Sequence, residues 1–212
     1  MELEIPKAQI IEQLKKQLSM HFFLSDDEKS VIDRYVDGAL DKCEVNFQVS
    51  DNKYFRGGQG AYFNPYHSVQ YMIFLYYLSH GIYAHGESTV LCDKIYYLNK
   101  IFHSVDLFYA INLPNEFGAE HPLGSVMGRA IYGNGFFFYQ GCTVGGTNAK
   151  DGTIYYPELG TNVRMYANSS ILGRCKVGNN VQIGAGALVK NEDIPDNCLV
   201  FGQSPNLIIK CR

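Results

Sequence analysis

The chain has 212 residues, a formal net charge of −3 and an isoelectric point near 6.1. This length allows one large domain, or a small domain beside a larger one. The slightly acidic balance gives no electrostatic basis for binding nucleic acid or an anionic membrane, so we expect neither partner. A hydrophobic fraction of 46% indicates a packed globular protein rather than a disordered one.

The N-terminal segment, the apolar runs and the cysteines indicate a compartment. Residues 1–6 lack the basic and then apolar pattern of a secretion signal. The longest apolar run, residues 71–78, is far shorter than the ~20 residues that span a bilayer, and it predicts a buried core or subunit-interface helix. The six cysteines form no C-x-x-C pair or compact cluster. Together these features predict reduced thiols, a cytoplasmic location and no membrane segment.

Helical periodicity dominates the start of the chain. Apolar residues recur at helical spacing over residues 7–23. Ser25 then precedes three acidic residues, which predicts a second helix, capped by the Ser25 hydroxyl and running toward Cys43. Residues 50–63 are rich in glycine and predict a loop, without the G-x-G-x-x-G spacing of a dinucleotide site.

Two more helices are expected before residue 106. Asn64-Pro65 predicts the start of an apolar helix that runs to about His80, because proline is tolerated in the first turn. Residues 87–103 predict another helix, with one apolar face made of Val90, Leu91, Ile95, Leu98 and Ile101. From about Asp106 the composition changes to glycine, asparagine, proline and β-branched residues. We therefore predict an α-helical subdomain at residues 1–105.

A period of six residues organises the second half of the chain. Aliphatic residues recur at every sixth position from 165 to 189: Met165, Ile171, Val177, Ile183 and Val189. Small or modest residues stand four positions after the first four of these: Ser169, Cys175, Val181 and Ala187. Six fits neither an α-helix nor a simple hairpin, but it is the hexapeptide period of a parallel β-helix. We predict such a coil over residues 106–212, with the aliphatic residues inside it.

The same period extends toward residue 106 with two interruptions. Leu107, Leu113 and Ala119 are six apart, and so are Tyr132, Phe138 and Val144, which predicts a register shift around residues 121–131. Residues 148–162 break the repeat with polar and turn residues, and they predict a loop expelled from the coil. Of the six histidines only His121 lies in the repeat region, so the coils cannot supply the three histidine ligands of a catalytic zinc site. We predict no metal.

Two segments of the coil resemble the serine acetyltransferase family. In residues 106–124, Asp106 is followed fifteen positions later by His121 and then by Gly124, as in the catalytic segment of that family. Residues 133–147, which end in Thr143-Val144-Gly145-Gly146-Thr147, are similar to its Gly-Asn … Gln-Ser-Val-Thr-Leu-Gly-Gly-Thr run. The similarity covers roughly residues 64–205. It implies a left-handed parallel β-helix after a helical subdomain, a homotrimer or a dimer of trimers, and acetyl-CoA as the donor.

The resemblance assigns catalysis to His121 and Asp106. If a coil takes three hexapeptides, fifteen residues return the chain nearly to the same face, and neighbouring strands lie ~4.8 Å apart, so Asp106 can reach a ring nitrogen of His121. His121 would act as general base on an acceptor hydroxyl as that hydroxyl attacks the thioester. Asp106 would hold the imidazole tautomer and stabilise the imidazolium. The acetyl group would pass directly to the acceptor, without a covalent enzyme intermediate.

The same resemblance places the donor along the groove between neighbouring coils. The positions that match its contacts with acetyl-CoA are Gly145, Gly146, Thr147, Ala167, Ala185 and Gly186. Lys190 and Lys210 are further candidates, which could meet the CoA phosphates as point charges. The acceptor-binding candidates are Glu120, Arg129, Tyr155 and Tyr156.

The acceptor region departs from the family pattern. The family has an Asp-Arg-His-Pro run in the expelled loop, where the Arg and His bind the serine carboxylate, whereas this chain has Ile154-Tyr155-Tyr156-Pro157. Two tyrosines do not replace the paired charge-assisted hydrogen bonds of a guanidinium. In addition, the Gly-Glu that follows the family's histidine is Gly128-Arg129 here, and its Asp is Glu120.

These departures leave alternatives open. One is a sugar or nucleotide-sugar O- or N-acetyltransferase of surface-polysaccharide synthesis with the same Asp106 and His121 pair, since tyrosines suit a sugar. A second is a non-catalytic β-helix scaffold. The sequence ends in Lys210-Cys211-Arg212, without the extended tail ending in Ile by which family members dock on the sulfhydrylase, so we do not expect that complex.

Overall fold

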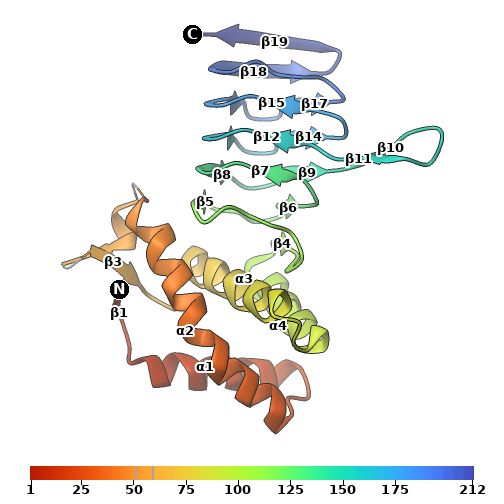
Figure 1. Ribbon diagram of the computed structural model, residues 1–212. Coiled ribbons are helices and arrows are strands. Elements are labelled where there is room, and N and C mark those ends of the chain that lie inside the picture. Colours follow the sequence, from red (N-terminus) through yellow and green to blue (C-terminus); the bar gives the residue numbers. More distant parts are fainter. Residues whose placement is uncertain (51, 59) are drawn as a thin grey trace. The chain divides into compact units, whose positions relative to one another are not determined.

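Figure 1 shows a computed structural model of the protein, which describes residues 1–50, 52–58 and 60–212. The chain forms two compact units. The first comprises Met1–His103 with Phe108–Ala110, and the second comprises Ser104–Leu107 with Ile111–Arg212. The boundary predicted between residues 105 and 106 falls in the short stretch where the chain alternates between the units. In the part of the chain that the structure describes, no helix combines the length and apolar character needed to span a membrane.

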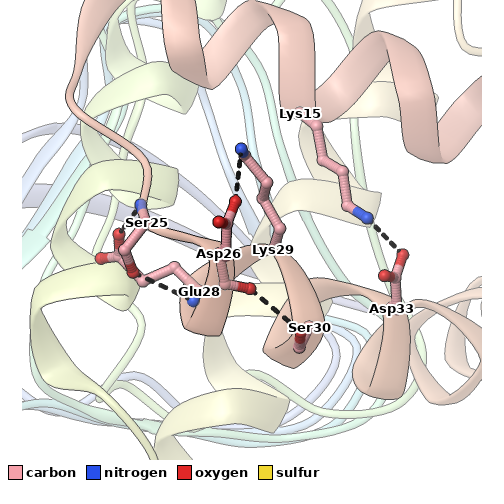
Figure 2. A network of polar contacts seen from close by, with 7 residues as sticks. All are labelled: Lys15, Ser25, Asp26, Glu28, Lys29, Ser30 and Asp33. Atoms are coloured by element: carbon pink, nitrogen blue, oxygen red, sulfur yellow. Dashed lines mark hydrogen bonds and ion pairs between the residues drawn. The ribbon is translucent and has the colours of Figure 1, made fainter.

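The first unit is mainly helical. Its helices are α1 (Lys7–His21), α2 (Asp26–Gln48), the short 3₁₀ helix η1 (Lys53–Phe55), α3 (Ser68–Ala84) and α4 (Thr89–His103). The predicted start of α2 is confirmed (Figure 2). The Ser25 hydroxyl accepts a hydrogen bond from the Glu28 backbone N–H at 3.2 Å, and the Glu28 carboxylate accepts one from the Ser25 N–H at 2.9 Å. This reciprocal capping box satisfies two backbone donors that a helix N-terminus otherwise leaves unpaired.

The prediction of a loop over residues 50–63 is wrong for its second half. Strands β2 (Arg56–Gly57) and β3 (Gly60–Phe63) form a small sheet with β1 (Glu2–Leu3), and β3 lies between the other two. Ala61 and Phe63 point into the unit and are buried. Strands of two to four residues are too short to show a period of two, which is why the pattern gave no signal. Residues 51 and 59 of the predicted loop lie outside the described residues.

Helix α3 begins three residues later than the proline at position 65 predicts. Asn64 forms a turn instead, because its side-chain oxygen accepts a hydrogen bond from the Tyr66 N–H at 2.8 Å, and the His67 N–H donates to the Asn64 carbonyl at 3.0 Å. The helix then continues past His80 to Ala84, before Gly86 adopts a φ of 72°. Every residue from 71 to 78 is buried, so this segment is core of the first unit, as predicted.

The apolar face of α4 is narrower than predicted. Leu91, Ile95 and Leu98 are fully buried, but Val90 and Ile101 are 58% and 42% exposed. At about 100° per residue, Val90 and Ile101 lie roughly a quarter turn away from the centre of the Leu91–Leu98 stripe. The prediction is therefore wrong for these two residues.

The second unit is a coil of short parallel strands that stack in three faces. Face A contains β7 (Ile131–Tyr132), β12 (Glu158–Leu159) and β15 (Lys176–Val177). Face B contains β5 (Phe117–Ala119), β8 (Phe136–Phe138), β13 (Arg164–Met165), β16 (Gln182–Ile183) and the first part of β18 (Cys198–Gln203). Face C contains β4 (Asp106–Leu107), β6 (Val126–Met127), β9 (Thr143–Gly145), β14 (Ser170–Leu172) and β17 (Leu188–Lys190). The last strand, β19 (Asn206–Cys211), pairs antiparallel with β18.

The six-residue period is confirmed as the period of this coil. Arg164 pairs with Gln182 and Ser170 pairs with Leu188, so partners in neighbouring coils are 18 positions apart, which is three hexapeptides. The five aliphatic residues of the register are at most 3% exposed, and the four small residues that follow them are at most 2% exposed. Both positions therefore face the interior of the coil.

The expelled segment is a hairpin that is shorter than the predicted loop 148–162. Strands β10 (Thr147–Asn148) and β11 (Ile154–Tyr155) pair antiparallel and project from the stack of coils (Figure 1). Strand partners in the coils before and after the hairpin are 27 positions apart, as Phe137 and Arg164 are, instead of the usual 18. The hairpin therefore inserts nine residues into the coil. The chain is back in the coil at β12, where Leu159 is buried.

The prediction that all six cysteines are reduced is wrong for two of them. Cys198 in β18 and Cys211 in β19 form a disulfide, while the other four cysteines are free and buried. Thirteen positions separate the pair in the sequence. They become direct partners only through the antiparallel pairing of β18 with β19, which the six-residue pattern does not predict.

Candidate functional site

His121 is presented at the turn that joins face B to face C. It stands two positions after the end of β5 and adopts a φ of 48°, and its carbonyl accepts a hydrogen bond from the Leu123 N–H at 2.8 Å. The Gly124 N–H donates to the Ser104 carbonyl at 2.7 Å, which holds this turn to the coil before it. The His121 side chain is 80% exposed in the single chain. It is therefore free to meet a ligand or another chain.

Glu120 is the acidic neighbour of this histidine. Its Oε1 lies 4.0 Å from Nε2 of His121. The Tyr139 hydroxyl, one coil further on, interacts with both Glu120 and Arg164. Burial raises the pKa of Tyr139, the Glu120 carboxylate adds to the rise, and Arg164 opposes it. The Tyr139 ring stacks on Tyr166 with centroids 5.3 Å apart, so packing fixes Tyr139 beside Glu120.

Asp106 begins face C next to the same turn. Its N–H donates to the Ser125 carbonyl at 2.8 Å, and its strand register pairs it with Val126. His121 lies five positions before Val126, in the turn that leads into that strand. The structure thus places Asp106 opposite the strand into which the His121 turn leads. We call the turn and its neighbours in later coils the His121 corner (residues 120–124, 139–141, 166–169 and 184–186).

Three of the predicted donor-binding residues also lie at the His121 corner. The Gly186 N–H donates to the Ala167 carbonyl at 2.9 Å, and Ala185 precedes Gly186 in the same turn. These small residues leave the backbone of neighbouring coils accessible. They are the members of the predicted donor set that share a corner with the histidine.

The other predicted residues gather at the next corner, where face C turns into face A. We call it the hairpin corner; it comprises residues 128–130, 146–157, 173–175 and 191–193. It holds Gly146, Thr147, Arg129, Tyr155 and Tyr156, with Gly145 and Lys190 at the strand ends that lead into it. The guanidinium carbon of Arg129 lies 5.4 Å from the centre of the Tyr156 ring. Lys210 lies apart from both corners, opposite Leu199 on β19.

The two corners are well separated within one chain. The five steps of chain from Gly124 through β6 to Arg129 span at most roughly 17 Å at about 3.3 Å per residue. A reacting donor and acceptor must approach within about 3–3.5 Å. The predicted acceptor residues Arg129, Tyr155 and Tyr156 therefore lie at a different corner from His121 of the same chain, whereas Glu120 lies at the same corner.

Sequence reasoning missed three residues that belong to these surroundings. Arg174 places its guanidinium carbon 5.8 Å from the centre of the Tyr155 ring. Tyr139 interacts with both Glu120 and Arg164. Arg174 could have been found from the coil length, because it stands at the hairpin corner one coil after Gly146. Among the described residues, no group of three His, Cys, Asp or Glu side chains is arranged to hold a metal ion.

The fold and these corners define the class of protein: a parallel β-helix of hexapeptide repeats, preceded in sequence by a helical unit, with an exposed histidine at one corner of the coil. Proteins of similar sequence are serine acetyltransferases. The serine acetyltransferase of Synechococcus elongatus is 36% identical over 126 residues, which are 59% of this chain and 50% of that protein. That of Staphylococcus epidermidis is 31% identical over 134 residues, which are 63% of this chain and 61% of that protein.

The chain thus spans between 50% and 61% of the length of these curated relatives. No family model matches it. Among solved structures, serine acetyltransferase of Neisseria gonorrhoeae is 26% identical with a TM-score of 0.62, over 85% of this chain and 66% of that one. Serine acetyltransferase of Brucella abortus is 19% identical and shares the fold with a TM-score of 0.70, over 96% of this chain and 82% of that one. These comparisons confirm the resemblance to the serine acetyltransferase family.

Proposed function

We propose that the protein transfers an acetyl group from acetyl-CoA to the hydroxyl of a small acceptor, as its serine acetyltransferase relatives are named for doing. The observation that carries this proposal is the exposed His121 at a coil corner, beside a carboxylate and within the segment that resembles the family's catalytic segment. A non-catalytic scaffold has no use for a histidine displayed in this way.

The chemistry follows from the residues at the His121 corner. A ring nitrogen of His121 takes the proton from the acceptor hydroxyl, and the hydroxyl oxygen attacks the thioester carbonyl of acetyl-CoA. Asp106 orients the ring and stabilises the imidazolium. When the tetrahedral adduct collapses, the C–S bond breaks and the imidazolium returns its proton to the CoA sulfur. General-base catalysis of this kind contributes typically 10²–10⁴-fold.

The donor would lie along the His121 corner, with its pantetheine arm over Ala167, Ala185 and Gly186. The backbone at these positions is open because their side chains are small or absent. Gly145, Gly146 and Thr147 would complete the contacts, with Lys190 and Lys210 as cationic groups for the CoA phosphates. Gly145, Gly146, Thr147 and the two lysines lie away from the His121 corner. They can therefore bind the same donor molecule only if a second chain supplies them.

We infer a left-handed coil and a trimer, or a pair of trimers, as the active form. The left-handed coil is what the resemblance implies. The physical reason for the trimer is that the two corners lie at opposite ends of face C. A threefold arrangement of coils brings the hairpin corner of one chain beside the His121 corner of the next and completes the site. The cytoplasmic location stays a prediction, and a disulfide such as Cys198–Cys211 is uncommon in that compartment.

A thiol-release assay with acetyl-CoA tests this proposal. We expect CoA release with L-serine or a related hydroxyl compound, and a loss of roughly 10²–10⁴-fold in kcat for His121→Ala with unchanged circular dichroism. Sugars and nucleotide sugars in the same panel test the alternative acceptor class. His121→Ala with wild-type turnover would remove His121 from the mechanism. No release with any acceptor, together with no CoA binding by calorimetry, would favour the scaffold.

A further inference from the structure

Two arginines flank the hairpin from the coils on either side of it. Arg129 stands in the turn after β6, one coil before the hairpin, and Arg174 stands in the turn before β15, one coil after it. Coils stack about 4.8 Å apart, so the two backbones are separated by roughly 10 Å at the same corner. Arginine side chains are long enough to reach one small group placed between two backbones at this separation. The hairpin emerges from the coil between the two.

Each of these guanidinium groups lies over the ring of a hairpin tyrosine. The guanidinium carbon of Arg129 is 5.4 Å from the Tyr156 centroid, and that of Arg174 is 5.8 Å from the Tyr155 centroid. Both distances fall within the roughly 6 Å over which a cation is attracted to a ring face. This attraction favours positions of the guanidinium group over the ring and leaves its N–H donors available. The hairpin therefore orients both arginines.

The positions of the two partners are fixed by the coil beneath them. The Arg174 N–H donates to Oδ1 of Asn191 at 2.9 Å, and the Thr147 hydroxyl donates to the same oxygen at 3.2 Å. On the other side, Gly146 leaves the space that the Tyr156 ring fills, since a Cβ at Gly146 would come within 2.9 Å of that ring. Backbone and hairpin thus hold the two stacked pairs together.

Neither arginine is neutralised by a carboxylate of the described residues. The ion pairs of the described part of the chain involve other cations; Lys176, for instance, lies 3.8 Å from Glu158. Acidic residues do occur one coil further on: Glu192 and Asp193, of which Asp193 accepts a hydrogen bond from the Lys176 N–H at 2.7 Å. They favour a singly charged guest over a doubly charged phosphate, because like charges repel.

We propose that Arg129 and Arg174 bind the carboxylate of the acceptor, and hence that the acceptor is a hydroxy acid or hydroxy amino acid rather than a neutral sugar. This inference rests on the proposed function. Two guanidinium edges supply the paired, charge-assisted hydrogen bonds that a carboxylate takes best. The tyrosines that occupy the Arg-His positions of the family's loop thus act as supports for arginines that come from the coil. The acceptor is then presented to His121 of the neighbouring chain.

Binding and turnover of the full-length protein test this assignment together. Calorimetry measures the affinity for L-serine, for its neutral amide and for glucosamine, and the CoA-release assay measures KM for each acceptor and for acetyl-CoA. We expect a preference for L-serine over its amide. Arg129→Gln and Arg174→Gln should each weaken L-serine binding and raise its KM by about 10- to 100-fold, with KM for acetyl-CoA unchanged. Lys150→Gln, which removes a cation from the hairpin away from the two tyrosines, serves as the matched control.

The outcomes separate this inference from the proposed function. Unchanged L-serine affinity in both arginine variants, equal use of the amide, or a preference for glucosamine overturns the arginine assignment while leaving acetyl transfer in place. Failure of the wild-type protein to bind L-serine overturns it whether or not CoA is released. The wild-type protein could also bind L-serine normally and release no CoA with any acceptor. If Arg174→Gln then abolishes L-serine binding, the carboxylate site is supported and the proposed acetyl transfer is overturned. A Lys150→Gln effect as large as that of the arginines shows a general charge effect and overturns the assignment.

Discussion

Gly146 and Tyr156 are in direct contact where the hairpin folds back onto the coil. A Cβ added to Gly146 would lie 2.9 Å from Cε1 of Tyr156 and 2.9 Å from Cγ2 of Ile154, closer than such atoms normally approach. Gly146 needs no special backbone conformation here, because its φ is not among the positive ones. Its lack of a side chain is therefore what allows the Tyr156 ring to sit on the corner. The resemblance assigned Gly146 to the donor, and the structure adds a role in seating the hairpin.

Gly146→Ala should displace the hairpin and leave the coil intact. We expect faster proteolysis or hydrogen exchange within residues 147–156, and a higher KM for the acceptor, while the free energy of unfolding changes by less than about 1 kcal/mol because the hairpin is exposed. Gly145→Ala is the matched control, since its Cβ would meet only Leu172, at an ordinary 3.8 Å. Equal exchange rates in the two variants would contradict this role.

The disulfide between Cys198 and Cys211 should account for a measurable part of the stability of the last coil. The two residues are 13 positions apart, and cross-linking a loop of about this length is worth about 3 kcal/mol in the loop-entropy account. We expect a reducing agent to lower the free energy of unfolding of the wild-type protein by an amount of this order. The measurement is chemical denaturation with and without dithiothreitol.

Cys198→Ala with Cys211→Ala provides the control for that comparison. Cys198 is buried, so its replacement also removes packing and lowers the baseline. The reductant effect isolates the bond: it should vanish in the double variant. An equal effect of reductant on both proteins would show that the loss comes from elsewhere.

The coil could be predicted from the sequence because its pattern is strict and repeated. Every sixth residue from Met165 to Val189 is an apolar side chain that points into the coil, and neighbouring coils pair 18 positions apart, so one period predicts both strand pairing and burial. The three strands β1 to β3 could not be predicted, since segments of two to four residues carry no period. The Cys198–Cys211 pair depends on the turn after β18, which lies outside the repeat.

The candidate site was predictable residue by residue but not as an arrangement. The fifteen-residue spacing named Asp106 and His121 as a pair, which stays a prediction. The family motifs also named Arg129 and Tyr156, which do come together. His121 and Arg129 lie at different corners, and the hairpin with its nine extra residues leaves the coil at the Arg129 corner. The sequence does not show at which corner the hairpin leaves. Arg174 escaped notice because an exposed arginine in a turn is ordinary in sequence. Its place at the hairpin corner follows from the coil length, and its position over Tyr155 makes it a candidate.

The buried His103 at the end of α4 should make the stability of the protein depend on pH. It is 7% exposed, its Nδ1 lies 2.7 Å from Oδ1 of Asn99, and burial lowers its pKa to about 4. In the unfolded chain a histidine takes up its proton near pH 6.5. Between these values the unfolded state binds more protons than the folded state. Stability is therefore complete above about pH 6.5 and falls as the pH drops toward 4, by up to about 3 kcal/mol.

Denaturation curves between pH 7.5 and 4 check this expectation against His103→Gln, which cannot titrate. The variant should be less stable at pH 7.5, because it replaces a packed ring, but its stability should fall less steeply. Burial also lowers the pKa of His67, which contributes in the same direction in both proteins. The difference between the two curves therefore reports on His103. Parallel curves would show that His103 is not held neutral in the folded protein.

A ladder of asparagines at the third corner, between faces A and B, should stabilise the coil in a way that depends on backbone conformation. The Asn162 amide donates to Oδ1 of Asn180 at 3.0 Å, and the Asn180 amide donates to Oδ1 of Asn197 at 2.9 Å. All three residues have φ between 56° and 59°, which asparagine and glycine tolerate best. Asn180→Ala loses both hydrogen bonds and keeps a Cβ in this conformation, whereas Asn180→Gly loses only the bonds. We expect alanine to lower the free energy of unfolding by about 1–2 kcal/mol more than glycine, measured by urea denaturation. Equal losses would show that side-chain hydrogen bonding alone, and not the left-handed backbone, makes asparagine the suitable residue at this corner.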